Sequence, residues 1–166
     1  MTQIITGKFK NRRLYSPDAV RPTKRAVREG IFSALGALSG CSFLDLCAGT
    51  GSVGCEALSR GASPVTLVDA YTDLSGLKVL FPDEPIQIIR QSAHKFLKHN
   101  PIPTDIIYLD PPWNRDDLYK RLMPLIMQDW LAPGGRLLVE MAKQKQPLFT
   151  PIKSYYYGNA GVHVYA

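Results

Sequence analysis

Short apolar runs and helix-like segments alternate between residues 42 and 140, and this alternation constrains the fold more than any other feature of the chain. Each apolar run has the length of a buried strand, and the segment after it repeats apolar side chains at helical spacing. This order predicts an α/β fold with a mostly parallel sheet, right-handed crossovers and helices on both faces. The expected strands are 42–46, 65–68, 86–89, 105–109 and 136–140, and the expected helices are 52–60, 74–80, 93–99 and 117–127.

The two ends of the chain predict additions to this sheet. Residues 2–9 and 13–15 are expected to pair as a small hairpin. A helix is expected to begin after Thr23, a residue type that favours the N-cap, and to end at Gly40. Strands at 155–157 and 162–165 should form an antiparallel hairpin at one edge of the sheet.

The length and the apolar pattern predict one domain that is not embedded in a membrane. The chain has 166 residues, close to the prior of about 150 per domain. We expect a basic extension over 1–22 and a core over 23–166. The longest apolar runs fall far short of the roughly 20 residues that a bilayer span needs, and no signal-peptide layout begins the chain. We therefore expect a cytoplasmic monomer. The three cysteines lack zinc spacing and are odd in number, which favours reduced thiols and no metal.

Positive charge is concentrated near the N-terminus. The net charge is +6, and residues 8–28 carry many basic side chains with Asp18 as their one acidic neighbour. Such a cluster favours a polyanion such as RNA, although a solvated surface is the simpler alternative. The residues predicted to contact RNA are Lys8, Lys10, Arg12, Arg13, Arg21, Thr23 and Arg28.

A glycine turn follows the first expected core strand. Gly49 and Gly51 permit a tight turn and a close approach of a ligand to the backbone, just where a helix begins. Asp69 ends the next strand, where a carboxylate can accept hydrogen bonds from ribose hydroxyls. The spacing to Gly54 also matches the dinucleotide fingerprint, so NAD is an alternative ligand. Asp45 favours S-adenosylmethionine, because a carboxylate there suits an ammonium group and not a pyrophosphate.

Asp110, Pro111, Pro112 and Trp113 follow the apolar strand 105–109 directly. In an open parallel sheet they would lie beside the glycine turn. The amino group of a nucleobase is a poor nucleophile because its lone pair is delocalised. A carboxylate and the Pro111 carbonyl can each accept one N–H and orient the nitrogen toward a methyl donor. The indole offers a face for stacking an unpaired base. We interpret these four residues as catalytic rather than as a turn that ends a strand.

The whole chain resembles the RsmD-like family of bacterial 16S ribosomal RNA guanine-N2 methyltransferases. The resemblance lies in Ile4-Ile5-x-Gly7-Lys8-Phe9-Lys10-x-Arg12, Val20-Arg21-Pro22-Thr23, Val27-Arg28-Glu29-x-Ile31-Phe32, Leu44-Asp45-Leu46-x-Ala48-Gly49-Thr50-Gly51, Glu56-Ala57-Leu58-Ser59-Arg60-Gly61-Ala62, Asp110-Pro111-Pro112-Trp113, and Trp130-Leu131 with Glu140. It implies a seven-stranded Rossmann-like class I methyltransferase fold that uses S-adenosyl-L-methionine. It also implies a substrate, the N2 amine of guanine 966 in 16S rRNA or in an assembling small ribosomal subunit.

The same resemblance implies which residues contact the cofactor. They are Asp45, Ala48, Gly49, Thr50 and Gly51 around the turn, Asp69 and Ala70 at the ribose, Ser92 and Ala93 at the adenine, and Asp110. Three departures stand out. Residues 71–85 are shorter than is usual in the family, Asp69 replaces a frequent Glu, and Ser92 replaces a frequent Asn or Asp.

Three alternatives remain open on the sequence. The same chemistry serves methyltransferases of adenine N6 in DNA or RNA and of protein glutamine, which usually carry Asn at the position of Asp110. A nucleotide-binding oxidoreductase fragment fits the glycine turn. A non-catalytic RNA-binding module fits the basic cluster, but it leaves Asp110 and the prolines without a role.

Overall fold

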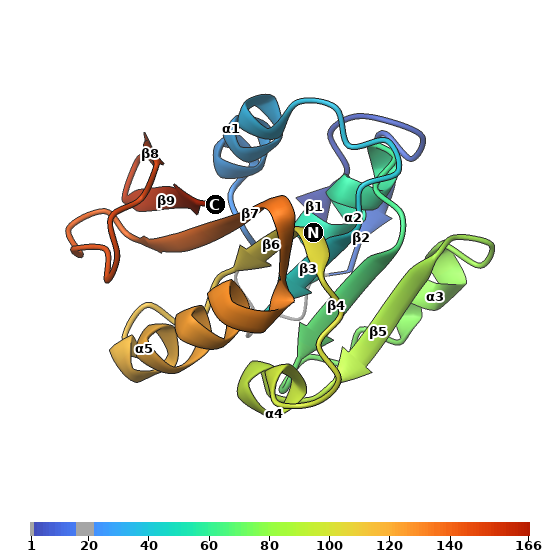
Figure 1. The fold of residues 1–166 in the computed structure, drawn as a ribbon. Helices are drawn as coiled ribbons and strands as arrows, with labels where there is room; N and C mark the ends of the chain where they lie inside the picture. The colour runs from blue at the N-terminus through green and yellow to red at the C-terminus, as the bar shows by residue number, and fades with distance from the viewer. Residues whose placement is uncertain (1, 16–21) are drawn as a thin grey trace.

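The computed structural model describes residues 2–15 and 22–166, and its main element is a seven-stranded sheet in the order β5-β4-β3-β6-β7-β9-β8 (Figure 1). β3, β4, β5, β6 and β7 pair in parallel, as the alternating sequence predicts. β9 is inserted antiparallel between β7 and β8. The core strands are β3 (Phe43–Leu46), β4 (Val65–Asp69), β5 (Ile86–Arg90), β6 (Thr104–Leu109), β7 (Leu131–Ala142), β8 (Lys153–Tyr157) and β9 (Ala160–Tyr165).

The register of the central strands places three functional segments at one edge of the sheet. Leu46, the last residue of β3, lies opposite Val68 of β4 and Leu109 of β6. The glycine turn, Asp69 and Asp110 therefore come together at the carboxyl ends of these strands. β3 continues to β4 on one side while β6 lies on its other side, which makes this edge the topological switch point where open α/β sheets bind ligands.

Helices cover both faces of the sheet, so the inner strands are buried on both sides. Phe43 of β3 packs in the apolar cluster on the face of α1, α2 and α3, whereas Leu44 and Leu46 pack in the cluster on the face of α4 and α5. This explains why the inner strands read as continuous apolar runs. The helices are α1 (Arg25–Leu35), α2 (Ser52–Ser59), α3 (Gly76–Leu80), α4 (Ala93–Leu97) and α5 (Asp116–Leu125), followed by a π-helical turn, η1 (Ile126–Trp130). No helix in the described part of the chain is long and apolar enough to cross a bilayer.

The N-terminal hairpin is present, but its predicted first strand over 2–9 is wrong in extent. β1 (Thr2–Gln3) pairs antiparallel with β2 (Arg13–Leu14). Beyond β1, Ile4 still bonds across the hairpin to Arg12 and Asn11, and the next backbone partners come from α2: the N–H groups of Ile5 and Thr6 donate to the Glu56 carboxylate, and the Lys8 N–H donates to the Ser59 carbonyl. The extension is thus attached to the core through α2 and not through a longer ladder.

The predicted ends of α1 are also wrong. The helix begins at Arg25 without a side-chain cap, so Thr23 is not its N-cap. It ends at Leu35, because Gly36 takes a left-handed conformation with φ of 75° four residues before the expected stop. Gly30 within the helix permits close packing on β8, since a Cβ there would lie 2.1 Å from the Tyr157 ring.

The C-terminal half differs from the expectation in β7. Leu131 already pairs with Thr104, and pairing resumes at Arg136 after a register shift. The predicted turn at 133–135 is therefore an irregularity inside β7, of the kind that a β-bulge produces. The C-terminal hairpin, in contrast, lies at the edge of the sheet as predicted, with β9 paired antiparallel to β7 and β8 outermost.

Candidate active site

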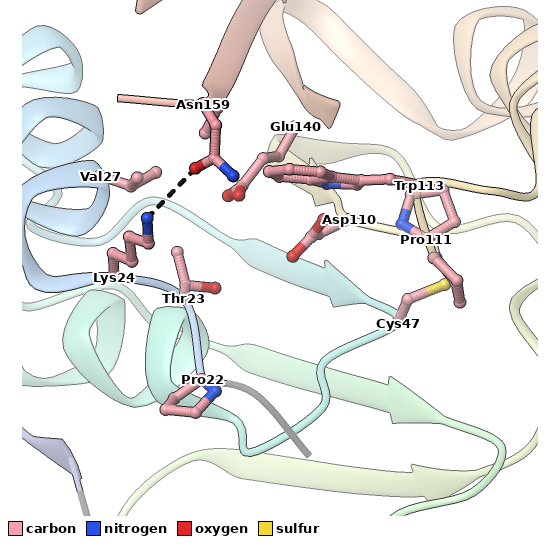
Figure 2. Close-up of a pocket in the computed structure, with 12 residues that line it drawn as sticks. Pro22, Thr23, Lys24, Val27, Cys47, Asp110, Pro111, Trp113, Glu140 and Asn159 are labelled. Carbon is pink, nitrogen blue, oxygen red and sulfur yellow. Dashed lines mark hydrogen bonds between the residues drawn. The ribbon is translucent and has the colours of Figure 1, made fainter. Parts of the chain in front are cut away.

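Two adjoining cavities meet at Asp110, at the carboxyl edge of the sheet. Both are lined by Cys47, Asp110 and Pro112. We call Asp110, Pro111, Pro112 and Trp113 the tetrad, and the cavity next to it the tetrad cavity. It has a volume of about 350 Å³ and is also lined by Pro22, Thr23, Lys24, Val27, Pro111, Trp113, Glu140, Asn159 and Ala160 (Figure 2). The Asp69 cavity has a volume of about 320 Å³ and is also lined by Val68, Asp69, Ala70, Tyr71, Ser92, Ala93, His94, Arg115, Leu118, Arg121 and Leu122.

The glycine turn has the tight geometry that the sequence predicts. Cys47, Gly49 and Gly51 all have positive φ angles, of 63°, 56° and 71°. The Gly51 N–H donates to the Ala48 carbonyl at 2.7 Å and closes the turn. At Gly54 a Cβ would lie 2.1 Å from the Leu67 side chain, so glycine lets α2 pack closely against β4. The turn is thus fixed by backbone conformation and close packing.

Asp45 holds this turn and lines neither cavity. Its side chain is buried, and its Oδ2 accepts the Gly54 N–H at 2.9 Å. Burial raises the pKa of Asp45 to about 7, while the Gly54 hydrogen bond acts in the opposite direction. Ala48, Gly49 and Gly51 also line neither cavity, and buried Thr50 lines a separate one. The predicted contact between the Asp45 carboxylate and an ammonium group stays a prediction, and in the structure this carboxylate holds the Gly54 end of the turn.

Asp69 is the last residue of β4, as the sequence predicts, and it lines the cavity that we name after it. Its Oδ2 accepts the Gly49 N–H at 2.9 Å, and its Oδ1 accepts the N–H groups of Tyr71 and Thr72 at 2.9 and 2.7 Å. These bonds fix the carboxylate relative to the turn. Ala70, Ser92, Ala93 and Asp110 line the same cavity, so the structure brings these predicted cofactor residues together.

Asp110 is surrounded by protein and by other carboxylates. Burial raises its pKa well above the usual range of an aspartate, Glu140 and Asp45 raise it further, and a hydrogen bond with Trp113 lowers it in part. Glu140 of β7 is buried and lines the tetrad cavity, and its Oε2 accepts the Tyr108 hydroxyl. The site therefore holds a carboxyl group that takes up a proton more readily than an exposed one.

The Pro111 carbonyl has a partner that the sequence did not reveal. Tyr119 of α5 is buried, and its hydroxyl lies 3.2 Å from the Pro111 carbonyl and 3.0 Å from the Glu140 carbonyl. A carbonyl oxygen has two lone pairs, so one remains for a second donor. Lys145 donates to the Trp113 carbonyl and pairs with Asp116, which ties the tetrad to the segment after β7.

The opposite wall of the tetrad cavity comes from the start of α1 and the β8–β9 turn. The Lys24 Nζ donates to the Asn159 Oδ1 at 3.1 Å, across from the indole of Trp113 (Figure 2). Thr23 lines this cavity too, as expected of a residue that faces the substrate. Asn159 and Cys47 were missed because their role depends on contacts between distant segments, although the Gly158-Asn159 pair did mark a turn.

Several of the predicted RNA-binding residues turn inward, and the prediction is wrong for Arg28. Its side chain is 2% exposed, and its guanidinium donates to the Gln3 carbonyl and the Thr2 hydroxyl at 3.1 and 2.9 Å. Its NH1 also lies 3.8 Å from the Glu56 carboxylate. Arg28 therefore attaches the hairpin to the core. Arg12 is half-buried, stacks on Phe9 with 4.6 Å to the ring centroid, and donates to a backbone carbonyl.

The other members of the predicted set are on the surface where the structure describes them. Lys10 and Arg13 are exposed. Lys8 is exposed as well and pairs with Glu84. Arg21 lies outside the described residues. The basic surface near the N-terminus is thus smaller than the sequence indicates.

Comparison with known proteins places the chain in a family. The family described as Conserved hypothetical protein 95 matches residues 2–166. The ribosomal RNA small subunit methyltransferase D of Haemophilus influenzae is 34% identical over 162 residues, covering 90% of this chain and 82% of the relative. The protein of the same name from Escherichia coli is 33% identical over 146 residues, covering 83% and 73%.

Solved structures agree with this relationship. A putative methyltransferase, yhhF from Escherichia coli, superposes with a TM-score of 0.87 at 28% identity and covers 98% of this chain and 96% of its own. SMU.776, a putative methyltransferase complexed with SAH, shares the fold with a TM-score of 0.64 at 18% identity, over 84% of this chain and 48% of its own. These neighbours confirm the Rossmann-like methyltransferase fold. The chain therefore belongs to the Conserved hypothetical protein 95 family, together with the ribosomal RNA small subunit methyltransferases D that its motifs resemble.

Proposed function

We propose that this protein transfers a methyl group from S-adenosyl-L-methionine to the exocyclic N2 amine of a guanine in 16S ribosomal RNA, at the position of the family's target, guanine 966. The observation that carries the proposal is the place of Asp110, in the wall shared by the two cavities. A group at this junction can contact a cofactor in one cavity and a nucleobase in the other. The names of the relatives support an rRNA substrate.

The Asp69 cavity fits the adenosine part of this cofactor. Its volume of about 320 Å³ lies within the range of small-molecule sites. The Asp69 carboxylate can accept ribose hydroxyls beyond the backbone N–H groups that it already holds. Ser92 and Ala93 line the same cavity and would contact the adenine. Asp45 acts through the turn that it holds. When bound, the cofactor supplies an activated methyl group on a sulfonium.

The tetrad orients the substrate amine. Asp110 accepts one N–H of the amine and the Pro111 carbonyl accepts the other, so the nitrogen lone pair is directed out of the base plane. Tyr119 fixes that carbonyl from the protein side. Trp113 presents the face on which the base stacks. Methyl transfer would form the N–C bond and break the bond between the methyl carbon and the cofactor sulfur, so that S-adenosylhomocysteine leaves. The nitrogen would then release a proton, and the raised pKa of Asp110 makes this carboxylate a suitable acceptor.

Adenine N6 is the second candidate target, because the same two acceptors would hold its amino group. Asp110 favours guanine, since the enzymes of adenine and glutamine that resemble this tetrad usually carry Asn there. RNA enters on the side of Lys10, Arg13, Lys8 and Thr23, with Arg28 removed from the predicted set because it is buried.

The test is transfer of a labelled methyl group from S-adenosylmethionine to unmethylated 16S rRNA or its assembly particles, followed by nucleoside mass analysis. We expect N2-methylguanosine at one position. Replacing that guanosine by inosine, which lacks the N2 amine, should abolish the product. A yield of N6-methyladenosine would identify the second candidate, and no transfer to either substrate would refute the proposal.

A further inference from the structure

A second exposed basic and aromatic surface lies next to the mouth of the tetrad cavity. We call it the hairpin surface and define it by Lys143, Tyr156 and Asn159. All three are exposed, and Asn159 also lines the cavity. In Figure 1 the β8–β9 hairpin and the segment before β8 project from the edge of the sheet beyond β7. Lys143 and Tyr156 are not part of the basic cluster near the N-terminus, which this surface meets at Lys24.

Hydrogen bonds connect this surface to the cavity. The Lys143 N–H donates to the Asn159 carbonyl at 2.9 Å. The Asn159 side chain in turn accepts from Lys24 at the start of α1. Tyr156 is the second-last residue of β8, and Asn159 is in the two-residue turn that joins β8 to β9. A polynucleotide with one base in the tetrad cavity can therefore extend its neighbouring residues over Tyr156.

The Tyr156 ring is presented as a platform. It is 53% exposed, whereas its neighbours Tyr155 and Tyr157 pack against the core. The ring lies over Gly161, where a Cβ would be 3.3 Å from it, and contacts His163 edge-on with 6.0 Å between the centroids. The Lys143 ammonium is 5.7 Å from the ring centroid. An exposed aromatic ring with an adjacent cation is the arrangement that binds unpaired nucleotides.

The charge of this region favours RNA as its partner. Residues 141–166 include Lys143, Lys145 and Lys153 and have no Asp or Glu. A protein that bound to the nearby exposed Leu148, Phe149 and Ile152 would tolerate acidic side chains in this region. A polyanion favours their absence, because each carboxylate near a phosphate is repulsive.

We propose that the hairpin surface binds the nucleotide next to the target base, with that nucleotide's base stacked on Tyr156 and its phosphate near Lys143. This assignment rests on the proposed function, since it requires a target base in the tetrad cavity. It makes Tyr156 a residue that binds substrate away from the reacting atoms. Its removal should therefore raise the KM for RNA and leave kcat unchanged.

The experiment compares Tyr156→Ala with Tyr156→Phe in methyl transfer to unmethylated 16S rRNA and in filter binding of the same RNA. Stacking on a ring contributes about fivefold or more to affinity. We expect the alanine variant to raise KM and the dissociation constant by about five- to tenfold, and the phenylalanine variant to match the wild type. Lys153→Ala is the matched control, because it removes a lysine from the other end of the same strand. Equal melting temperatures of all variants establish that they are folded.

Each result has a defined meaning. Equal KM values and RNA affinities for the alanine and phenylalanine variants would overturn the assignment. A defect of Tyr156→Ala on assembled particles, with none on naked rRNA, would identify a ribosomal protein as the partner and also overturn it. If the wild type binds 16S rRNA but transfers no methyl group, the proposed function fails, while the filter-binding comparison still decides the role of Tyr156.

Discussion

Charged side chains at the carboxyl edge of the sheet and charged side chains near the N-terminus differ in whether they line a cavity or pack against the protein. At the edge, Asp69 and Asp110 line adjoining cavities, where the sequence predicts them. Near the N-terminus, Arg28 of α1 is buried and Arg12 of the extension stacks on an aromatic ring, although both were predicted to face RNA. Charged side chains are thus available to ligands in one region and hold the fold together in the other.

The difference has a physical origin. The ends of parallel strands meet at one edge whatever the surrounding side chains are, so their position follows from the alternation of elements. The extension has no such constraint, because its short hairpin must find hydrogen-bond partners on the core. It finds them at Glu56 of α2, which is fully buried and accepts from Ile5, Thr6 and Arg60. Arg28 of α1 lies beside this carboxylate and bonds to the same hairpin, whereas Arg12 turns inward to the Leu80 carbonyl and the Phe9 ring.

The largest effect is expected from a change of Glu56. If Glu56 proved dispensable for stability, the comparison between the two regions would fail. Glu56→Gln leaves the Arg28 guanidinium buried without its compensating charge. We expect the free energy of unfolding to fall by about 3–5 kcal/mol, measured by urea denaturation. Glu29→Gln is the control, because Glu29 forms an exposed pair with Arg25 and should change stability by less than about 0.5 kcal/mol. Equal losses in the two variants would contradict a structural role for the buried cluster.

Asp110→Ala tests the opposite region, where the carboxylate serves chemistry. Removing one preorganised partner of the reacting group should lower kcat by about 10²- to 10³-fold. Binding of S-adenosylhomocysteine, measured by calorimetry, should change by only a few-fold, since Asp69 and the glycine turn remain. Asp105→Asn provides a control at the other end of β6, where the side chain accepts from Ser42. Unchanged turnover in Asp110→Ala would refute the catalytic assignment.

The pH dependence of stability tests the burial of Asp45. Its pKa is raised by burial from 3.8 to about 7 in the folded protein. Between these values the folded state keeps a proton that the unfolded chain has released, so stability is lost as the pH rises from about 4 through 7. Asp45→Asn removes this titrating group, and the asparagine carbonyl oxygen can still accept the Gly54 N–H. We expect the stability difference between wild type and variant to change by at least about 1 kcal/mol over this range, measured by denaturation at each pH. A constant difference would count against the burial effect.

The smallest effect separates exposed from inward-facing basic residues in the extension. In the double variant Lys10→Ala, Arg13→Ala, the slope of log K for 16S rRNA binding against log salt concentration should become less steep by about 1 for each phosphate that the protein no longer neutralises. Arg12→Ala should lower stability by about 1 kcal/mol, because its guanidinium lies over Phe9, and should change the salt slope less. Binding measured between low and moderate salt gives both slopes. Equal slopes for the double variant and the wild type would exclude a phosphate role for Lys10 and Arg13.

Local sequence patterns were sufficient to predict the alternating fold, the glycine turn and the place of Asp69 and Asp110. These features depend on short-range periodicity and on backbone conformations such as those of Gly49 and Gly51, which nearby residues dictate. The early end of α1 at Gly36 has no distinguishing local signal, because Gly36 and Gly40 both take positive φ angles, of 75° and 77°.

Long-range packing, in contrast, sets where side chains point when their partners are distant in sequence. Arg28 contacts residues 2 and 3, Asn159 contacts Lys24, and Tyr119 reaches the Pro111 carbonyl through the packing of α5. No periodic pattern in the sequence predicts these contacts, because each forms where two different elements pack together. A buried polar group must find a partner wherever packing supplies one, and here that requirement turned Arg28 inward while leaving Asp110 open to both cavities.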